Sequence, residues 1–327
     1  MRSSSSRRWR IAAALLVTAL ATTACAVRGI VPTPTVSTST VASVPSDPSD
    51  TADAANDDAT SPIGGSAVAS TGPLVDAVAA LEGNGYHVGL AAAAMGGQTS
   101  LVAGDWAGGE AWSSIKVPLA IAATRAGEGV SLGNGEDRFP YGACASYGTV
   151  DAAIMKAITV SDNCAAWQLW EGLGGDGSAA AGDVDQVLRD GGDVTTQVVT
   201  SGVGTRLTFG MTVWSLADQA TFAAHLPQLA GADPTYADMG LPKGDASAGA
   251  GLNVFTGAYT KAGWGDAAPG GAVTRQFGVV PVGDGQCSAV AIGTDRSSDA
   301  FATLTAIALA IQANLSSLPT GPCPSGM

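Results

Sequence analysis

Three short groups of polar residues in this chain could together carry out nucleophilic chemistry. The first is Ser113-Ser114-Ile115-Lys116. A spacing of three residues on a helix places Ser113 and Lys116 on neighbouring turns of one face. A serine hydroxyl is a weak nucleophile until a base lies beside it, and a partly desolvated lysine can be that base. Taken alone, the pattern is more often a surface serine and lysine. However, the chain has only four lysines, and two of them fall in these groups.

The place of Ser113 in its helix decides what its backbone can do. If Ser113 stands at the helix start, its N–H and the helix dipole point toward a developing oxyanion. Pro118 must then lie in or near the first turn, where proline costs little.

The other two groups also have ordinary interpretations. Ser161-Asp162-Asn163 directly precedes an apolar helical stretch, and all three residue types are favoured helix caps. Lys261-Ala262-Gly263 follows Tyr259 at the expected end of a strand, where a solvated lysine is common. Neither group by itself indicates a function.

In order, the three groups resemble the Ser-x-x-Lys, Ser-Asp-Asn and Lys-Thr-Gly signature of class A β-lactamases and penicillin-binding proteins. The separations of 48 positions (113 to 161) and 100 positions (161 to 261) are similar to those of that family. The resemblance covers roughly residues 71–318 and includes 192–195 and 207–208.

The resemblance implies a role for each matching residue. Ser113 would be the acylated nucleophile and Lys116 its base, and Ser161 would relay the proton toward the leaving nitrogen. Lys261 would supply positive charge on the opposite wall. The backbone N–H groups of Ser113 and Trp264 would form the oxyanion hole, and Asp162 would be a buried structural partner. The expected substrate-binding positions are Asn163, Ala262, Gly263, Trp264 and Arg275.

Two departures from the family pattern bear on activity. Ala262 stands where the family has a hydroxyl that binds the substrate carboxylate, and Arg275 on the next strand could compensate by pairing with that carboxylate. A solvated strand arginine is an equal alternative for Arg275. The segment 265–271 is also longer than is usual in the family.

The second departure concerns deacylation. Class A β-lactamases use a glutamate after the helical lobe to activate water, but no glutamate follows Glu171 in this chain. The corresponding stretch 198–204 contains no carboxylate, and Asp193 belongs to the preceding turn. Efficient β-lactamase activity is therefore not expected.

The N-terminus indicates export. Arginines precede an apolar run over 11–24, which suits a signal-peptide core and is too short to span a bilayer comfortably. The run ends in Thr22-Thr23-Ala24-Cys25, which resembles a bacterial lipobox, with Thr22 in place of the usual leucine. We expect lipidation at Cys25; a cleaved secretory peptide is the alternative.

The cysteines fit an exported chain. Five are present, and lipidation of Cys25 would leave four for two bridges with three possible connectivities. Cys144–Cys164 and Cys287–Cys323 are favoured because short loops close most readily.

The expected organisation has four parts: a signal peptide (1–24), a lipid-anchored flexible tether (25–70), a β-lactamase-like domain (71–318) and a C-terminal tail (319–327). The tether is rich in Pro, Thr, Ser, Ala and Asp and lacks aromatic residues, so it cannot offset its ordering entropy by burial. The net charge of −13 argues against nucleic acid and anionic lipid as partners. Membrane contact is expected through Cys25 only, on the extracytoplasmic face, with a monomeric domain.

The order of elements predicts an α/β (α+β) fold, an antiparallel sheet built from both termini with packed helices and a helical lobe. Strands are expected at 86–92, 98–103, 257–261, 276–282 and 287–294, and helices at 73–81, 113–125, 150–160, 164–173, 184–189, 214–226 and 299–315.

The functional hypothesis is an envelope lipoprotein with an active-site serine that acts on peptidoglycan-like peptides and reacts slowly with β-lactams. One alternative is a degenerate binding or scaffold module, and another is a true β-lactamase with an unrecognised water base. No metal or cofactor is expected, because no His/Cys cluster has ligand spacing. His87 and His225 are expected to be structural.

Overall fold

A computed structural model describes most of the folded region, and all of it lies within one compact unit. The described residues are 71–132, 144, 146–201, 207–267, 271–296 and 298–325. The predicted signal peptide, Cys25 and the tether lie outside them, as do 202–204 of the predicted deacylation stretch and the last two residues of the tail.

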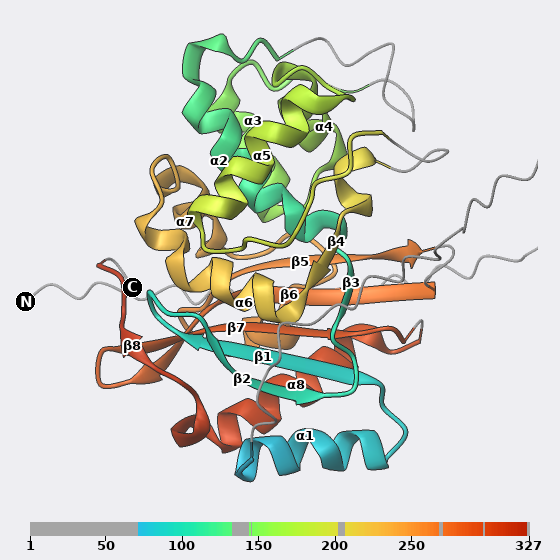
Figure 1. Cartoon of the computed structure of the whole chain (residues 1–327), viewed down its shortest axis with the longest axis vertical. Helices are drawn as coiled ribbons and strands as arrows, with labels where there is room; N and C mark the ends of the chain where they lie inside the picture. Colours follow the sequence, from blue (N-terminus) through green and yellow to red (C-terminus); the bar gives the residue numbers. More distant parts are fainter. Residues whose placement is uncertain are drawn as a thin grey trace, which may run out of the picture. The chain divides into compact units, whose positions relative to one another are not determined.

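The centre of the fold is an antiparallel sheet with the strand order β2-β1-β7-β6-β5, and a short β8 pairs with β7 (Figure 1). The N-terminal strands are β1 (Val88–Ala94) and β2 (Thr99–Gly104). The C-terminal strands are β5 (Tyr259–Ala267), β6 (Gly271–Gly283), β7 (Gln286–Thr294) and β8 (Gly321–Pro322). The predicted fold class, with a sheet assembled from both termini, is confirmed.

The central strand β1 is buried on both faces because its alternate residues belong to different cores. Leu90 and Ala92 pack in the cluster that includes α1 (Pro73–Gly83) and α8 (Ala300–Ala313). Ala91 and Ala93 face the opposite cluster, which is made mainly by the other helices. The sheet therefore separates two cores, and the near-continuous apolar run of β1 forms an interior strand between β2 and β7.

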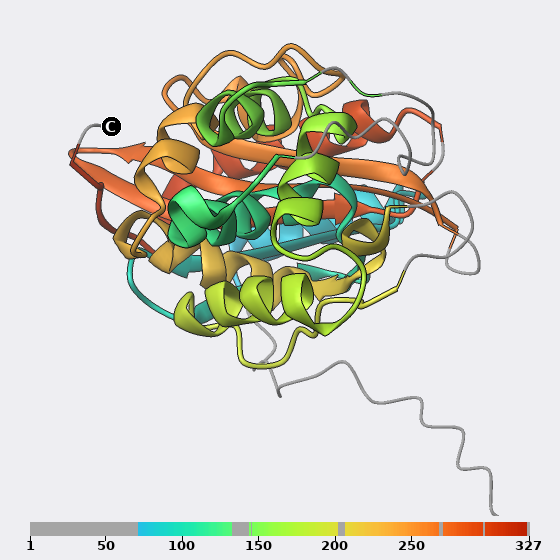
Figure 2. The same ribbon diagram turned by 90° about the horizontal axis from the view of Figure 1, so that it is seen from above.

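The helices divide between the two faces of the sheet, as Figures 1 and 2 show. On one face, α1 and α8 pack against the sheet and each other. On the other face, α6 (Leu216–His225) lies against β1, β6 and β7. The helical lobe lies beyond and beside it. Its helices are α2 (Lys116–Ala126), α3 (Val150–Thr159), α4 (Asn163–Gly172), α5 (Ser178–Asp190) and α7 (Asp233–Met239).

Short elements connect the lobe to the sheet. The 3-10 turn η1 (Trp112–Ile115) lies against β5, and η3 (Thr208–Met211) lies against η1. A two-stranded ribbon pairs β3 (Gly108–Glu110) with β4 (Val213–Ser215). Four further 3-10 turns are η2 (Gly127–Gly129), η4 (Leu226–Gln228), η5 (Gly251–Val254) and η6 (Leu315–Ser317).

Two predicted element boundaries are wrong in ways that matter for the site. Lys261 is the third residue of β5 rather than its last, because the strand continues through Ala262 and Gly263 in register with β6. The helix predicted from Trp214 starts instead at Leu216, capped by the Ser215 hydroxyl, which accepts a hydrogen bond from the N–H of Asp218. Residues 213–215 form β4.

Two disulfides are present, and they are the pairs expected from the sequence. Cys144 and Cys164 are joined with a Cα–Cα distance of 5.4 Å, and Cys287 and Cys323 with 4.8 Å. The first lies in the helical lobe, and the second ties β7 to the C-terminal segment. Within the described ranges, no helix combines the length and apolarity needed to cross a bilayer.

Candidate active site

The predicted nucleophile lies on a tight turn between the ribbon and the lobe. Ser113 is half-buried in η1, and α2 begins three residues later at Lys116. Pro118 is the third residue of α2, so its missing N–H has no intrahelical acceptor to lose. Trp112, directly before Ser113, has φ of +48°, in the left-handed region that residues with a Cβ rarely adopt.

Glycine in the third motif allows β5 to pass close to this turn. A Cβ on Gly263 would lie 2.4 Å from the Ala111 carbonyl oxygen, 2.7 Å from the Ser114 nitrogen and 3.0 Å from the Ser113 nitrogen. These are backbone atoms that cannot move aside cheaply. Any other residue would therefore push β5 away from the nucleophile.

Lys116 is buried at the bottom of the site. Its side chain is 1% exposed, and its Nζ donates to the Ser161 carbonyl oxygen at 2.6 Å and to Asn163 Oδ1 at 2.7 Å. Burial and the neighbouring Lys261 hold the pKa of Lys116 well below its usual value, while Asp162 and Asp245 oppose the shift. A lysine with a depressed pKa supplies the neutral amine that a general base requires.

Lys261 of β5 also contacts Ser161. Its Nζ donates to Ser161 Oγ and to the Ala262 carbonyl oxygen, both at 2.9 Å. Burial lowers the pKa of Lys261 to about 7, Asp245 opposes the shift, and Lys243 adds to it. Ser161 is thus bonded to both lysines, to one through its carbonyl and to the other through its hydroxyl.

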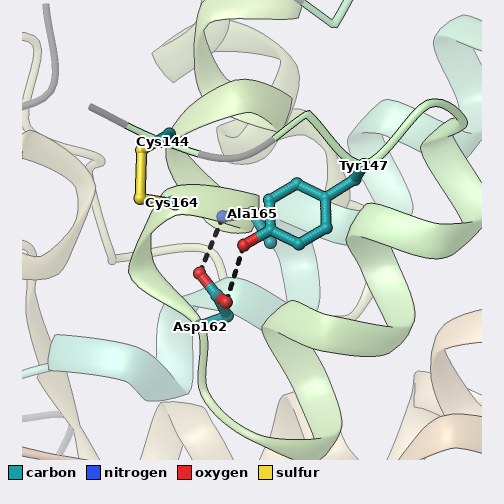
Figure 3. Close-up of a disulfide and its surroundings, with 5 residues drawn as sticks. All are labelled: Cys144, Tyr147, Asp162, Cys164 and Ala165. Carbon is teal, nitrogen blue, oxygen red and sulfur yellow. Dashed lines mark hydrogen bonds between the residues drawn. A yellow bond between two sulfur atoms is a disulfide. The ribbon is translucent and has the colours of Figure 1, made fainter. Parts of the chain in front are cut away.

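The backbone of Ser161 has to adopt an unusual conformation to face both lysines. Its φ is +57°, and the surrounding cap holds it there. Asp162 caps α4 by accepting a hydrogen bond from the N–H of Ala165 at 3.0 Å, and the Tyr147 hydroxyl donates to it at 2.6 Å (Figure 3). The Cys144–Cys164 disulfide lies beside this cap. Asp162 is a structural partner, as the resemblance implies.

Arg275 is not where the resemblance places it. Its side chain is fully buried behind the nucleophile turn, and its guanidinium donates to Gln219 Oε1 and to the carbonyl oxygens of Gly109 and Trp214. It therefore cannot pair with a substrate carboxylate in this conformation. Ala262 is also buried, so neither residue offers a carboxylate anchor.

Trp264 continues β5 beyond Gly263 on the outermost strand of the sheet. Its ring packs edge-to-face on Phe301 of α8, with ring centroids 5.4 Å apart. Its backbone therefore belongs to a strand whose outer edge is not paired with another described strand.

One acid beside the two lysines, Asp245, was not predicted from the sequence. Its loop is joined to the end of α3 by a hydrogen bond from the Gly244 N–H to the Thr159 carbonyl oxygen at 2.9 Å. Asp245 raises the pKa of both Lys116 and Lys261. Its Oδ1 accepts from the Ser247 N–H and hydroxyl, whereas Oδ2 is buried without a hydrogen bond. No sequence motif indicated a role for Asp245, since a single aspartate in a long loop resembles any turn residue.

The described part of the loop after α5 supplies no acid near the lysines. Asp193 is fully buried and accepts hydrogen bonds from the N–H groups of Thr195 and Thr196. Burial raises the pKa of Asp193. The charge of Asp218 in α6 adds to this shift of the pKa.

The two histidines have other partners. His87 lies between Asp295, at 2.5 Å from Nδ1, and Asp105, at 3.3 Å from Nε2. The Nδ1 of His225 lies 3.0 Å from the Thr221 carbonyl oxygen in its own helix. Among the residues that the structure describes, no group of three or more His, Cys, Asp or Glu side chains could hold a metal ion.

Comparison with known proteins identifies the fold. No protein-family model matches the sequence, and no curated protein sequence matches it. Solved structures do match. A class A β-lactamase from Mycobacterium abscessus is 17% identical with a TM-score of 0.56, and the match covers 75% of this chain and 100% of that one. A β-lactamase from Sphaerobacter thermophilus is 19% identical, with a TM-score of 0.54 and coverage of 76% and 98%. The TLA-3 extended-spectrum β-lactamase is 14% identical, with a TM-score of 0.56 and coverage of 74% and 98%.

The folded region thus has the serine β-lactamase fold. At these identities the likeness establishes the fold alone. What the chain does has to be argued from its own residues.

Proposed function

We propose that this protein is an active-site-serine acyl-transfer enzyme of the bacterial cell envelope that acts on peptidoglycan-like peptides and hydrolyses β-lactams poorly. One observation carries the proposal. Two buried lysines meet at Ser161, and the Lys116 of this pair begins the helix that follows Ser113. Burying two amines is costly even with carboxylates nearby, so such an arrangement favours a site that uses them.

The proposed chemistry uses each of these groups in turn. The neutral amine of Lys116 takes the proton of the Ser113 hydroxyl as Ser113 Oγ attacks the substrate carbonyl carbon. When the tetrahedral intermediate collapses, the carbon–nitrogen bond breaks, and Ser161 Oγ passes its proton to the leaving nitrogen. Lys261 returns a proton to Ser161 along their hydrogen bond. The product is an acyl ester on Ser113 and a free amine.

Slow turnover of the ester is part of the proposal. The described loop after α5 offers no carboxylate beside the lysines to activate water. The acyl group therefore persists on Ser113 until a nucleophile such as a second amine accepts it. This favours a penicillin-binding enzyme over a β-lactamase.

A labelling experiment tests the proposal. The purified domain is incubated with a fluorescent penicillin, and the covalent adduct is followed on denaturing gels, with Ser113→Ala as the control. We expect a long-lived adduct on the wild-type protein and none on the variant. Rapid release of hydrolysed penicillin would favour a β-lactamase instead.

A catalytically degenerate binding or scaffold module is the second candidate. Two observations favour it: the side chain of Ala262 cannot donate a hydrogen bond, and Arg275 is fully buried against Gln219. The absence of any adduct with penicillin and with a fluorophosphonate serine probe would establish it over the enzyme.

We further propose that the protein is a lipoprotein anchored through Cys25 on the extracytoplasmic face of the cell membrane. The lipobox-like sequence before Cys25 and the tether-like composition after it support this. Metabolic labelling with an alkyne fatty acid should mark the wild-type chain and not Cys25→Ser. Equal labelling of both would refute it.

A further inference from the structure

Arg275 is a large buried cation with no place in the mechanism above. Its Nε and Nη2 donate to Gln219 Oε1 at 3.1 and 2.8 Å. Its Nη1 donates to the carbonyl oxygens of Gly109 and Trp214, both at 2.8 Å. One side chain thereby joins β6, α6 and both strands of the β3–β4 ribbon.

Gln219 extends this contact to the nucleophile turn. It is fully buried in α6, and its Nε2 donates to Ser114 Oγ at 3.0 Å. The Ser114 hydroxyl donates in turn to the Ala111 carbonyl oxygen at 2.6 Å. With the Oε1 of Gln219 occupied by the guanidinium, its amide group is oriented to donate to Ser114 and not to accept.

The turn that ends this chain of hydrogen bonds needs support. Trp112, inside it, has the left-handed φ of +48°, a conformation that persists only where surrounding contacts determine it. The Ala111 carbonyl oxygen also accepts from the Ser114 N–H at 3.0 Å, and the Ala111 N–H donates to the Thr212 carbonyl oxygen at 2.7 Å. Ala111 and Ser114, on the two sides of Ser113, are thus held in place, which fixes the backbone that carries the Ser113 side chain.

We propose that Arg275, Gln219 and Ser114 form a positioning chain, in which the buried guanidinium orients Gln219, and Gln219 and Ser114 hold the turn that carries the nucleophile Ser113. This inference rests on the proposed acyl transfer to Ser113. It gives Arg275 a role behind the nucleophile in place of carboxylate recognition.

The test separates positioning from folding. Ser114→Ala removes one hydroxyl, and Gln219→Leu removes the amide with little change of volume. For each variant, the saturation constant and the limiting acylation rate are measured with fluorescent penicillin. We expect the limiting rate to fall about tenfold to a hundredfold, with the saturation constant within about twofold of wild type, because a misaimed nucleophile loses rate rather than binding.

A matched control and a double variant sharpen the result. Ser288 is a fully buried serine of β7 whose hydroxyl also donates to a backbone carbonyl, that of Ala93 at 3.4 Å. Ser288→Ala should acylate at the wild-type rate. The Ser114→Ala/Gln219→Leu double variant should be no slower than the slower single variant, since both remove one chain.

Two outcomes overturn the inference while leaving the proposed function standing. In the first, Ser114→Ala and Gln219→Leu are acylated as fast as wild type. In the second, the control Ser288→Ala is slowed as much as Ser114→Ala and Gln219→Leu. An unreactive wild type would overturn the inference and the proposed function together. Thermal melting of every variant shows whether a slow one is folded. Should Gln219→Leu fail to fold, Ser114→Ala alone decides.

Discussion

Two sets of buried cationic side chains flank the nucleophile turn, and they differ in how fully they are bonded. On the side of Ser161, Lys116 and Lys261 are each bonded to two oxygens and have strongly lowered pKa values. On the far side, Arg275 makes four hydrogen bonds and lies over the Trp106 ring at 5.7 Å. Burial lowers the pKa of Arg275 only to about 9, so it stays charged at neutral pH.

The two kinds of buried cation are suited to different roles. A lysine has a single nitrogen that can lose its proton and act as a base, whereas a guanidinium spreads its charge over a rigid donor fork. The lysine pair is therefore suited to proton transfer and the arginine to fixing geometry. The following predictions test this contrast between the lysine pair and Arg275.

The largest effect is expected from Lys116→Met. Loss of the general base should slow acylation of Ser113 about 10²- to 10⁴-fold. Removing a buried amine should leave the melting temperature unchanged or raise it, because the cost of taking the amine out of water disappears. Lys156→Met, at an exposed lysine of α3, is the control and should react normally. A reactive Lys116→Met variant would show that Lys116 is not the base.

Removing the Cys144–Cys164 disulfide should lower the free energy of unfolding by about 3 kcal/mol for a separation of 20 residues. Acylation should slow as well, because this bridge lies beside the cap that holds Ser161. The Cys287–Cys323 bridge spans 36 residues and ties down the chain terminus. Its removal should cost a similar free energy in urea unfolding without slowing acylation. Each bridge is removed by replacing both of its cysteines with serine. Equal acylation rates for the two variants would show that the Cys144–Cys164 bridge does not support the active site.

The pH dependence of acylation should report Lys261. Its ammonium donates to Ser161 Oγ, so the rate should fall as pH rises through about 7, where Lys261 loses its proton. Asp245 raises the pKa of Lys261, and Asp245→Asn should therefore move this fall to lower pH. Asp284→Asn, in the exposed turn between β6 and β7, should leave the profile in place. If the pH profile of acylation were unshifted in Asp245→Asn, Asp245 would not influence Lys261.

Folding stability should depend on the same shift. An unfolded lysine keeps its proton up to about pH 10.5, whereas folded Lys261 loses it near 7. The unfolded chain therefore binds more protons between these values, and the contribution of Lys261 to the free energy of unfolding should rise with pH in that window. Urea unfolding of wild type and Lys261→Met at pH 7 and 9 measures it. The wild-type increase should be larger, and equal increases would contradict the low pKa.

The smallest effect is expected from Tyr147→Phe. This change removes the 2.6 Å hydrogen bond to Asp162 while leaving the N-cap bond to Ala165 in place. The free energy of unfolding should fall by about 1 kcal/mol, a typical value for one hydrogen bond. A double-mutant cycle with Asp162→Asn isolates the pair, and a coupling energy near zero would show that Tyr147 does not support the cap.

Local patterns predicted much of the fold. Apolar patterns gave most strands to within a few residues, and helical spacing gave α2, α3, α4 and part of α5 in the lobe, because both signals are short-range. The ribbon strands β3 and β4 and helix α7 were missed. They are three to seven residues long and carry too little periodicity to be recognised.

The candidate site was predicted in part, and the reasons for success or failure differ from residue to residue. Lys116, Ser161, Asn163 and Lys261 lie together as their motifs suggested. Arg275 was misplaced because a strand arginine has the same sequence signature whether its face is open or covered by α6. Asp245 was missed because the two lysines whose pKa it raises lie on other elements.

The sequence by itself determined the order of the elements, the spacing of the three motifs and the short disulfide loops, since these depend on neighbouring residues and on chain length. The tertiary structure alone decided which side chains are buried and what each one faces. The low pKa values of the two lysines and the withdrawal of Arg275 behind Ser113 both follow from that burial. They depend on contacts between residues many positions apart, and no local pattern encodes such contacts.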